Sequence, residues 1–438
     1  MVDPMTELFL RLHDRRVHFH IPPQWRLLSF AEFTDRPEPA DVVGMVRRAL
    51  KKPIDHPPLS EAAGSSDKIA IVIEDPSRSS PKQLVLRALL LELAEADVPP
   101  DHVIIVIGLG THRRLDREEM RRVYGDDLVD TYEFVNHDCR AQDLVPIGAL
   151  RSGTTVAINR RVAEADFKIG IGSIFPHPMN GFGGGGKIIF PAVANFEAIL
   201  EHHLTYSFRG DSKIGRLEGN PFYEEIRDLA TAAGLDLVIN SVLDHNDRLY
   251  QPVCGAPVQA HVAGVAMSRQ ILSMPFPARS DVTIISSFPY SEGTQIMKPL
   301  APATEITRPE GVIILACDYS VPLAEDYVSG CKAFRTAHAG RIRPAVLERF
   351  GRGERILANG SPEFNMSLAQ ALLGQHDFRI IVVSQDMPRR TVERIGFAFA
   401  DDIEQAIAMA QEDYPVAQVN VVPSGGVILP VLSGAAAE

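Results

Sequence analysis

The sequence lacks the features of membrane-bound, secreted and nucleic-acid-binding proteins. It has no apolar run of membrane-spanning length, and its first residues, MVDPMTELFL, lack the basic head and long apolar stretch of a signal peptide. Positive charge is also in deficit, because 44 Lys and Arg against 56 Asp and Glu give a net charge of −12. This charge disfavours nucleic acid and anionic membranes as partners. We therefore expect a cytoplasmic protein.

Cysteine and conventional metal-binding patterns are scarce as well. The four cysteines lie far apart and form no CxxC pair, which is typical of reduced structural thiols. No HExxH run or Cys-rich spacing is present to indicate an ordinary zinc site. Trp25 is the only tryptophan.

What is present indicates a globular α/β protein. A chain of 438 residues with 45% hydrophobic and 23% charged residues is long enough for two or three domains. Apolar runs alternate with helical patterns, which predicts two domains, each with a mainly parallel sheet flanked by helices and right-handed crossovers. We place the boundary at the Pro275-Phe-Pro277 break. We expect residues 1–275 to form one domain and residues 276–438 the other, with the ligand site in the cleft between them. The Gly-rich, apolar tail at the C-terminal end of the sequence can pack back on the first domain.

The expected strands are short runs of mostly apolar residues. Their carboxyl ends are the places where ligands bind in open parallel sheets. The first domain should contain strands near Lys68–Glu74, Val103–Ile107, Thr155–Ile158, Phe167–Phe175 and Leu235–Val242, and the second near Thr283–Ser287, Val312–Ala316, Arg379–Ser384 and Gln418–Val422.

One stretch, Gly172 to His203, concentrates unusual chemistry: GSIFPHPMNGFGGGGKIIFPAVANFEAILEHH. Five of the six positions from 181 to 186 are glycine. Glycine costs backbone entropy to order, so we expect this run to approach a ligand closely. His177 should lie at the exit of the preceding strand. Lys187 is followed by three large apolar residues, which should lower the pKa of its amine and make it a nucleophile.

A helix should follow from Asn195, a suitable cap. Apolar residues recur there at helical spacing, and His203 falls on the same inward face. His202 does not, so we expect His202 to be the more exposed of the pair and His203 to be the functional one.

Two general motifs compete for this stretch. Gly181 to Lys187 fits the GxxxxGK part of a phosphate loop, but Ile188 stands where Ser or Thr is needed, and a strand-like run follows instead of a helix. A zinc hydrolase could use His112, His177 and His203. A metal-dependent hydrolase and a non-catalytic nucleotide- or phosphate-binding protein therefore both remain open.

Other candidate residues come directly after the predicted strands. Asp75 and Arg78 lie in a loop at a helix N-terminus, where anions bind, although the two could equally form a loop ion pair. His112 comes after the next strand, so His112 and His177 could face each other across one substrate. Gln295 and Lys298, in the second domain, would share one face of a helix.

The central stretch closely resembles the nickel-pincer lactate racemase family, whose signature is a PH, Gly-rich, Lys run followed by a histidine one helix later. The resemblance implies that Lys187 is covalently joined to a nickel pincer nucleotide, the pyridinium-3-thioamide-5-thiocarboxylic acid mononucleotide with Ni. It also implies that His203 binds the nickel and that His177 and His112 are the two acid/base catalysts. The remaining implied cofactor contacts are Asp75, Arg78, Gly183, Gly184, Gly185 and Gly186, and the implied substrate contacts are Arg78, Gln295 and Lys298. The resemblance thus implies that residues 1–275 are the cofactor-binding and catalytic domain, and that residues 276–438 contribute substrate contacts to an active site in the interdomain cleft.

The resemblance further implies the reaction. Family members are isomerases that racemise or epimerise 2-hydroxy acids by proton-coupled hydride transfer through a 2-oxo acid, and separate enzymes synthesise the cofactor. Lactate-active members place an aromatic residue beside the Gln and a tryptophan in the second domain. Here the neighbour is Thr294 and residues 276–438 contain no tryptophan. We therefore expect a substrate other than lactate: another aliphatic or aromatic 2-hydroxy acid, malate or a sugar acid.

Overall fold

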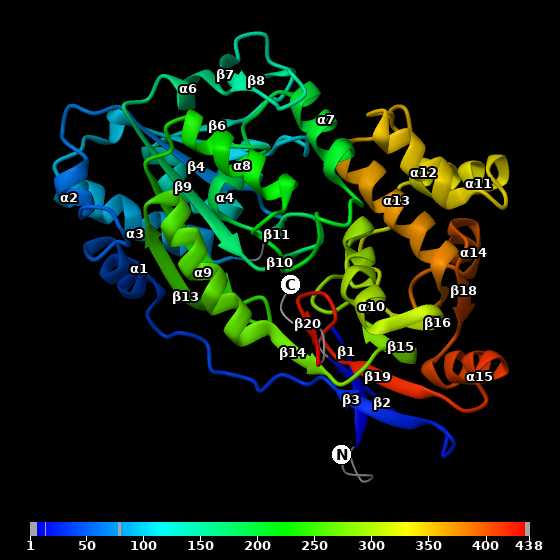
Figure 1. The fold of residues 1–438 in the computed structure, drawn as a ribbon. Helices are drawn as coiled ribbons and strands as arrows, with labels where there is room; N and C mark the ends of the chain where they lie inside the picture. The colour runs from blue at the N-terminus through cyan, green and yellow to red at the C-terminus, as the bar shows by residue number, and fades with distance from the viewer. Residues whose placement is uncertain (1–6, 14, 78–79, 434–438) are drawn as a thin grey trace. The chain divides into compact units, whose positions relative to one another are not determined.

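The computed structural model describes residues 7–13, 15–77 and 80–433 (Figure 1). The chain forms two compact units. One comprises Arg36–Ile271, and the other comprises Met1–Asp35 together with Leu272–Glu438. None of the helices in the described ranges is long and apolar enough to cross a membrane.

The unit Arg36–Ile271 is built on a six-stranded sheet in the order β13-β12-β9-β4-β5-β6. Neighbouring strands are parallel except for the antiparallel pair β12 and β13. The carboxyl ends of the parallel strands therefore meet at one edge, as predicted. The strands are β4 (Ile69–Glu74), β5 (Val103–Gly108), β6 (Glu133–Asn136), β9 (Phe167–Ile174), β12 (Leu237–Leu243) and β13 (Leu249–Gly255).

Both faces of this sheet are covered, which explains why its strands read as continuous apolar runs. All eight residues of β9 are buried. Ile169 and Ile171 join a core formed with α1 (Val42–Lys51) and α3 (Lys82–Glu95), whereas Ile174 lies against α9 (Pro257–Leu272) on the other face (Figure 1).

The remaining elements of this unit are short. A hairpin of β7 and β8 is antiparallel. Helix α8 begins at Pro221, and the Asn220 side chain accepts hydrogen bonds from the first backbone N–H groups, a combination of proline and cap that starts a helix firmly. The elements are α2 (Leu59–Ala62), η1 (Pro100–His102), α4 (Arg117–Tyr124), α5 (Asp126–Thr131), β7 (Val145–Ala149), β8 (Thr155–Ile158), α6 (Arg160–Ala163), α7 (Phe196–Tyr206) and α8 (Pro221–Ala232).

The glycine-rich segment forms a small hairpin followed by a single 3₁₀ turn. Strands β10 (Pro176–His177) and β11 (Gly181–Phe182) pair antiparallel, and η2 (Gly185–Ile188) carries Lys187. The predicted strand-like run after Lys187 is therefore wrong. Its residues are buried because they pack on the face of the sheet, where Ile188 lies over Gly170, and a short apolar run does not distinguish that arrangement from a strand.

The second unit contains a wholly parallel six-stranded sheet in the order β18-β17-β16-β15-β19-β3. Two smaller pairs are the hairpin β1–β2 and the parallel pair β14–β20. The strands are β1 (Leu8–Leu12), β2 (Arg15–Phe19), β3 (Arg26–Phe30), β14 (Ser273–Phe276), β15 (Ser280–Ser286), β16 (Thr307–Ala316), β17 (Arg379–Val383), β18 (Ala398–Ala400), β19 (Gln418–Val422) and β20 (Leu429–Leu432). The helices are η3 (Gly293–Met297), α10 (Leu300–Ile306), α11 (Glu325–Ala337), α12 (Ile342–Gly351), α13 (Pro362–Asp377), α14 (Arg389–Ile395) and α15 (Ile403–Asp413).

The division of the chain differs from the predicted 1–275 and 276–438. Residues 1–35 belong with the C-terminal unit, because β3 pairs in parallel with β19. The tail belongs there too, since β20 pairs with β14. Trp25 consequently lies in this unit, where it is buried and its indole N–H donates to the Tyr414 carbonyl at 2.9 Å.

Candidate functional site

Asp75 and His112 form a hydrogen-bonded pair at the carboxyl ends of two adjacent strands, β4 and β5. The His112 Nδ1 atom lies 2.9 Å from Asp75 Oδ2, and the carboxylate is more buried than the imidazole. Because a carboxylate oxygen accepts, His112 donates from Nδ1 and its neutral form carries the lone pair on Nε2. Asp75 is therefore placed to orient His112. Arg78, the other candidate in this loop, lies outside the described residues.

His177 lies at the exit of β9, as predicted, and has the opposite tautomer. Its Nδ1 accepts hydrogen bonds from the backbone N–H groups of Met179 and Asn180, at 3.3 and 3.1 Å. The neutral ring then carries its hydrogen on Nε2. The Nε2 of His112 can thus accept a proton, whereas the Nε2 of His177 carries a hydrogen that it can donate in a hydrogen bond.

The ring of Phe222, at the start of α8, is shared by three predicted site residues. Its centroid lies 6.3 Å from the His177 ring, 5.8 Å from Lys187 Nζ and 5.1 Å from the His203 ring. The structure therefore gathers Lys187, His177 and His203 around one buried aromatic side chain. Sequence reasoning missed Phe222, because an apolar residue in the first turn of a helix carries no chemical signal.

His203 is a neutral imidazole with a defined tautomer. Its Nδ1 donates to the Ile199 carbonyl one turn earlier in α7, at 2.9 Å, so the lone pair is on Nε2, the nitrogen that can bind a metal. Burial, with a further contribution from the Lys187 charge, lowers the pKa of His203 to about 3. The ring therefore needs no deprotonation before it binds a cation.

His202 is fully buried, so the prediction that it is the more exposed of the pair is wrong. Its ring lies among those of Phe190, Tyr206 and Phe222, at centroid distances of 5.0, 5.0 and 4.5 Å. Its Nε2 also bonds the Phe222 carbonyl at 3.2 Å. The helical pattern located the inward face of α7 correctly, but α8 and Phe190 cover the neighbouring face as well.

The glycine run packs against protein atoms, which the sequence did not indicate. Gly184 and Gly185 have positive φ angles of 80° and 58°, which other residues adopt only with strain. Protein atoms also occupy the space that side chains would need at four positions. An added Cβ would lie 2.9 Å from the Ser173 carbonyl oxygen at Gly183, 2.7 Å from Ile174 at Gly184, 2.7 Å from the His261 ring at Gly185 and 2.8 Å from Ala230 at Gly186.

Two of the competing motifs lose support. Lys187 lies in a 3₁₀ turn that does not continue into an α-helix, unlike a phosphate loop. Across the described ranges, no three His, Cys, Asp or Glu side chains gather as a metal site. His112, His177 and His203 therefore do not form the ligand set that a zinc hydrolase needs.

Gln295 and Lys298 belong to the other unit. Gln295 lies in η3 and Lys298 caps it, and residues three apart eclipse one another in a 3₁₀ helix. The Gln295 Oε1 atom is buried and has no hydrogen-bond partner among the residues described. Lys298 Nζ lies 4.2 Å from the centroid of the Tyr290 ring. Their role in substrate binding stays a prediction.

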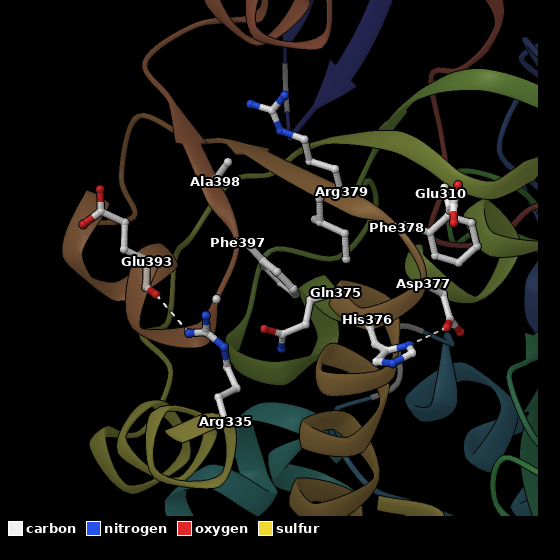
Figure 2. Close-up of a pocket in the computed structure, with 12 residues that line it drawn as sticks. Glu310, Arg335, Gln375, His376, Asp377, Phe378, Arg379, Glu393, Phe397 and Ala398 are labelled. Atoms are coloured by element: carbon white, nitrogen blue, oxygen red, sulfur yellow. Dashed lines mark hydrogen bonds and ion pairs between the residues drawn. The ribbon is translucent and has the colours of Figure 1, made fainter. Parts of the chain in front are cut away.

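A cavity of about 550 Å³ lies at the amino ends of β17 and β18, in the same unit as Gln295 (Figure 2). Arg335, on its wall, donates to the carbonyls of Glu393 and Arg394 at the end of α14, 3.4 Å away in both cases. His376 and Asp377 pair at 2.8 Å. Since ligands of open parallel sheets bind at the carboxyl ends, this cavity lies at the opposite end from the expected one.

Comparison with known proteins shows which proteins this chain is similar to. A profile for the lactate racemase N-terminal domain matches residues 12–215. A lactate racemase of Thermoanaerobacterium thermosaccharolyticum is 27% identical over 391 residues, covering 87% of this chain and 88% of the relative. Another, from Lactiplantibacillus plantarum, is 30% identical over 274 residues, covering 62% of this chain and 64% of the relative.

Solved structures agree at the level of the fold. The lactate racemase apoprotein of Thermoanaerobacterium thermosaccharolyticum has a TM-score of 0.85 at 23% identity, covering 97% of this chain and all of that one. A protein from Thermotoga maritima has a TM-score of 0.64 at 17% identity, covering 91% of this chain and 100% of that chain. The chain is thus similar to the lactate racemase N-terminal domain over residues 12–215 and to lactate racemases, which are isomerases, over most of its length.

Proposed function

We propose that this protein racemises or epimerises a 2-hydroxy acid, with a nickel pincer nucleotide tethered to Lys187. The observation that carries the proposal is the grouping of Lys187, His177 and the neutral His203 around the Phe222 ring. A nucleophilic amine, a metal-binding nitrogen and an acid/base group are the parts that such a tethered metal cofactor requires.

The residues present fit this cofactor better than a bare metal ion. His203 supplies a single imidazole donor, and no three-residue ligand cluster exists in the described ranges. A metal held here must therefore bring most of its donors with it, as nickel bound by the sulfur atoms of a pincer does. Lys187 would form the covalent link and His203 would bind the nickel. The predicted nucleotide contacts are Asp75, Arg78, Gly183, Gly184, Gly185 and Gly186.

The cofactor supplies an acceptor and donor of hydride when bound, and the two histidines act on the hydroxyl oxygen and its proton. Removing a proton from carbon beside a carboxylate would build charge on an anion, so moving hydride from carbon avoids a carbanion. His112 accepts the hydroxyl proton at Nε2, and Asp75 stabilises the resulting imidazolium. His177, whose Nε2 carries the hydrogen, donates a hydrogen bond to the substrate oxygen. The proton held on His112 returns to that oxygen when the opposite face is rebuilt, so no net proton is lost or gained.

The substrate carboxylate needs its own contacts while the planar 2-oxo acid reorients. We propose Arg78, Gln295 and Lys298 for this role, because charge-assisted hydrogen bonds hold carboxylates firmly. The buried Oε1 of Gln295 has no partner in the described part of the chain, so this side chain has hydrogen-bonding capacity for a hydroxyl group.

The substrate is proposed to be a 2-hydroxy acid other than lactate. Thr294 stands where lactate-active members are expected to place an aromatic residue. Trp25, although it lies in the second unit, is a core residue bonded to the Tyr414 carbonyl and does not replace the missing one. We further propose that the protein acts in the cytoplasm and depends there on the enzymes that synthesise the cofactor.

The experiment is a turnover assay on protein co-expressed with the cofactor-synthesis enzymes. Single enantiomers of lactate, malate, an aromatic 2-hydroxy acid and a sugar acid are incubated, and the opposite isomer is measured by chiral chromatography. We expect inversion of one of the last three and none by protein made without those enzymes. Preferred turnover of lactate would contradict the substrate proposal alone, and inversion by unloaded, nickel-free protein would contradict the cofactor. Loaded protein that inverts none of the four acids would contradict the proposed reaction.

A further inference from the structure

Two buried polar side chains, Asn240 and His261, form hydrogen bonds with the backbone of the glycine run. Neither residue was predicted from the sequence. We propose that Asn240 and His261 are positioning residues that fix the backbone of Gly183–Gly185, so that Lys187 is aimed for covalent attachment of the cofactor. This inference rests on the proposed function, because it concerns the attachment step.

Asn240 holds the amide that follows Gly184. It lies in β12, directly beside Gly172 of β9, and is 1% exposed. Its Oδ1 accepts a hydrogen bond from the Gly185 N–H at 3.1 Å, which fixes the orientation of its amide. Its Nδ2 is buried without an acceptor in the described ranges. A buried amide with one orphaned group destabilises a fold, so stability alone gives no reason for an asparagine here.

His261 holds the carbonyl that precedes Gly184. It lies in α9, is 1% exposed, and its Nε2 donates to the Gly183 carbonyl at 2.9 Å. Burial lowers the pKa of His261 to about 4, so the ring is neutral and donates one hydrogen here. Tyr223 stacks on the same ring at 5.6 Å with an interplanar angle of 26°, which fixes its plane.

The two bonds act on Lys187 through the backbone. They secure the groups on either side of Gly184, which has a φ angle of 80°, and the Gly184 carbonyl accepts from the Lys187 N–H at 3.3 Å. The conformation of Gly183–Gly185 therefore sets where η2 begins and where the lysine Cα lies. Holding a reacting group in place before reaction saves the entropy of ordering it, and a small misplacement slows the step strongly.

The experiment measures the rate of covalent loading. Unloaded protein is incubated with the cofactor-synthesis enzymes and their substrates, and the loaded fraction is followed by intact mass. His261→Phe keeps a ring against Tyr223 but removes the donor, His261→Gln keeps a donor, and Asn240→Leu removes the acceptor. The matched control is His137→Phe, which changes a buried histidine of the same unit that bonds the Ala194 carbonyl instead of the glycine run.

We expect His261→Phe and Asn240→Leu to load at least about tenfold more slowly than wild type, with His261→Gln closer to wild type and His137→Phe unchanged. Circular dichroism confirms folding. If one of these two variants fails to fold, the other is compared with His137→Phe and decides, because His261→Phe and Asn240→Leu each remove a separate bond to the glycine run. If wild type gains the cofactor mass and the variants gain it equally fast, the role of Asn240 and His261 is wrong, while the proposed function stands. Wild type that never gains mass would overturn the proposed function.

Discussion

The two units are built on similar six-stranded sheets, yet the residues at the carboxyl ends of their strands differ. In Arg36–Ile271, the carboxyl ends of β4, β5 and β9 lead to Asp75, His112 and His177. In the other unit, β16 and β17 lead to Cys317 and Ser384, and burial raises the pKa of the Cys317 thiol to about 12. Ser384 accepts a hydrogen bond from the Met387 N–H. This edge of the parallel sheet therefore carries Asp75 and two histidines in one unit. In the other unit it carries a buried thiol, a locally bonded serine and Asp318, which pairs with Arg15 at 3.5 Å, so the architecture alone does not decide function.

The largest effects on activity are expected at the two histidines of Arg36–Ile271. His112→Ala and His177→Ala should each lower turnover of loaded enzyme by about 10²- to 10⁴-fold, because each removes a positioned acid or base. Covalent loading should not change. Cys317→Ala, at the corresponding edge of the other sheet, should change turnover by less than about twofold. An equal loss of turnover in Cys317→Ala would show that the carboxyl edge of the second sheet also takes part in the reaction.

The metal ligand is the next test. His203→Ala should lower retained nickel by more than about tenfold while the mass added at Lys187 persists, because the tether and the ligand are separate side chains. His202→Phe is the matched control, since it keeps a ring among the aromatic neighbours of His202. Elemental analysis of nickel content distinguishes the His203→Ala variant from the His202→Phe variant. Loss of nickel from His202→Phe with retention in His203→Ala would reverse the assignment.

The second unit is expected to contribute binding and no acid/base chemistry. Gln295→Ala and Lys298→Ala should raise KM for the preferred hydroxy acid by roughly 10- to 100-fold, the effect of losing a charged or buried hydrogen bond. Loading and nickel content should match wild type. Lys332→Ala changes an exposed lysine of the same unit and is the control. A loss of loading in the Gln295 or Lys298 variant would place these residues in cofactor binding instead.

The smallest effect on activity is expected at the cavity of Figure 2. Gly396 has a φ of 110°, and an added Cβ would lie 2.1 Å from Gln375 Oε1 and 2.5 Å from Arg335 Cζ, both on side chains bonded to backbone carbonyls. Gly396→Ala should therefore lower the free energy of unfolding by about 1–3 kcal/mol without changing kcat. Denaturant titration measures this.

The control for that stability change is Gly340→Ala. Gly340 also has a positive φ, of 75°, but nothing lies within 4 Å of an added Cβ. It should lower the free energy of unfolding by less than Gly396→Ala does. A large fall in kcat for Gly396→Ala with an unchanged free energy of unfolding would show that the cavity takes part in the reaction.

Local patterns predicted the features that short segments determine. Continuous apolar runs located four strands of each sheet, β4, β5, β9 and β12 in one and β15, β16, β17 and β19 in the other, but β6, β13 and β18 were not predicted. The residues that follow β5 and β9 placed His112 and His177 at the expected edge. Helical spacing located α7 and the inward position of His203. These features depend on side-chain periodicity within a few residues.

Features that depend on distant segments were not predictable. The pairing of β3 with β19 joins residues nearly 400 positions apart and leaves no mark in either strand alone. The burial of His202 depends on α8 and Phe190, and the bonds from Asn240 and His261 to the glycine run come from elements later in the chain. Tertiary contacts of this kind have no sequence period to detect.

We propose that the carboxyl edge of the sheet in Arg36–Ile271 holds a lysine-tethered nickel cofactor. The most direct test is peptide mapping by mass spectrometry, with nickel analysis, of wild type, Lys187→Ala and Lys213→Ala, each co-expressed with the cofactor-synthesis enzymes. Lys213 is an exposed lysine of the same unit. We expect added mass on the peptide that contains Lys187, with nickel in proportion, in wild type and Lys213→Ala, and neither added mass nor nickel in Lys187→Ala. Unmodified wild type, or added mass that survives Lys187→Ala, would contradict it.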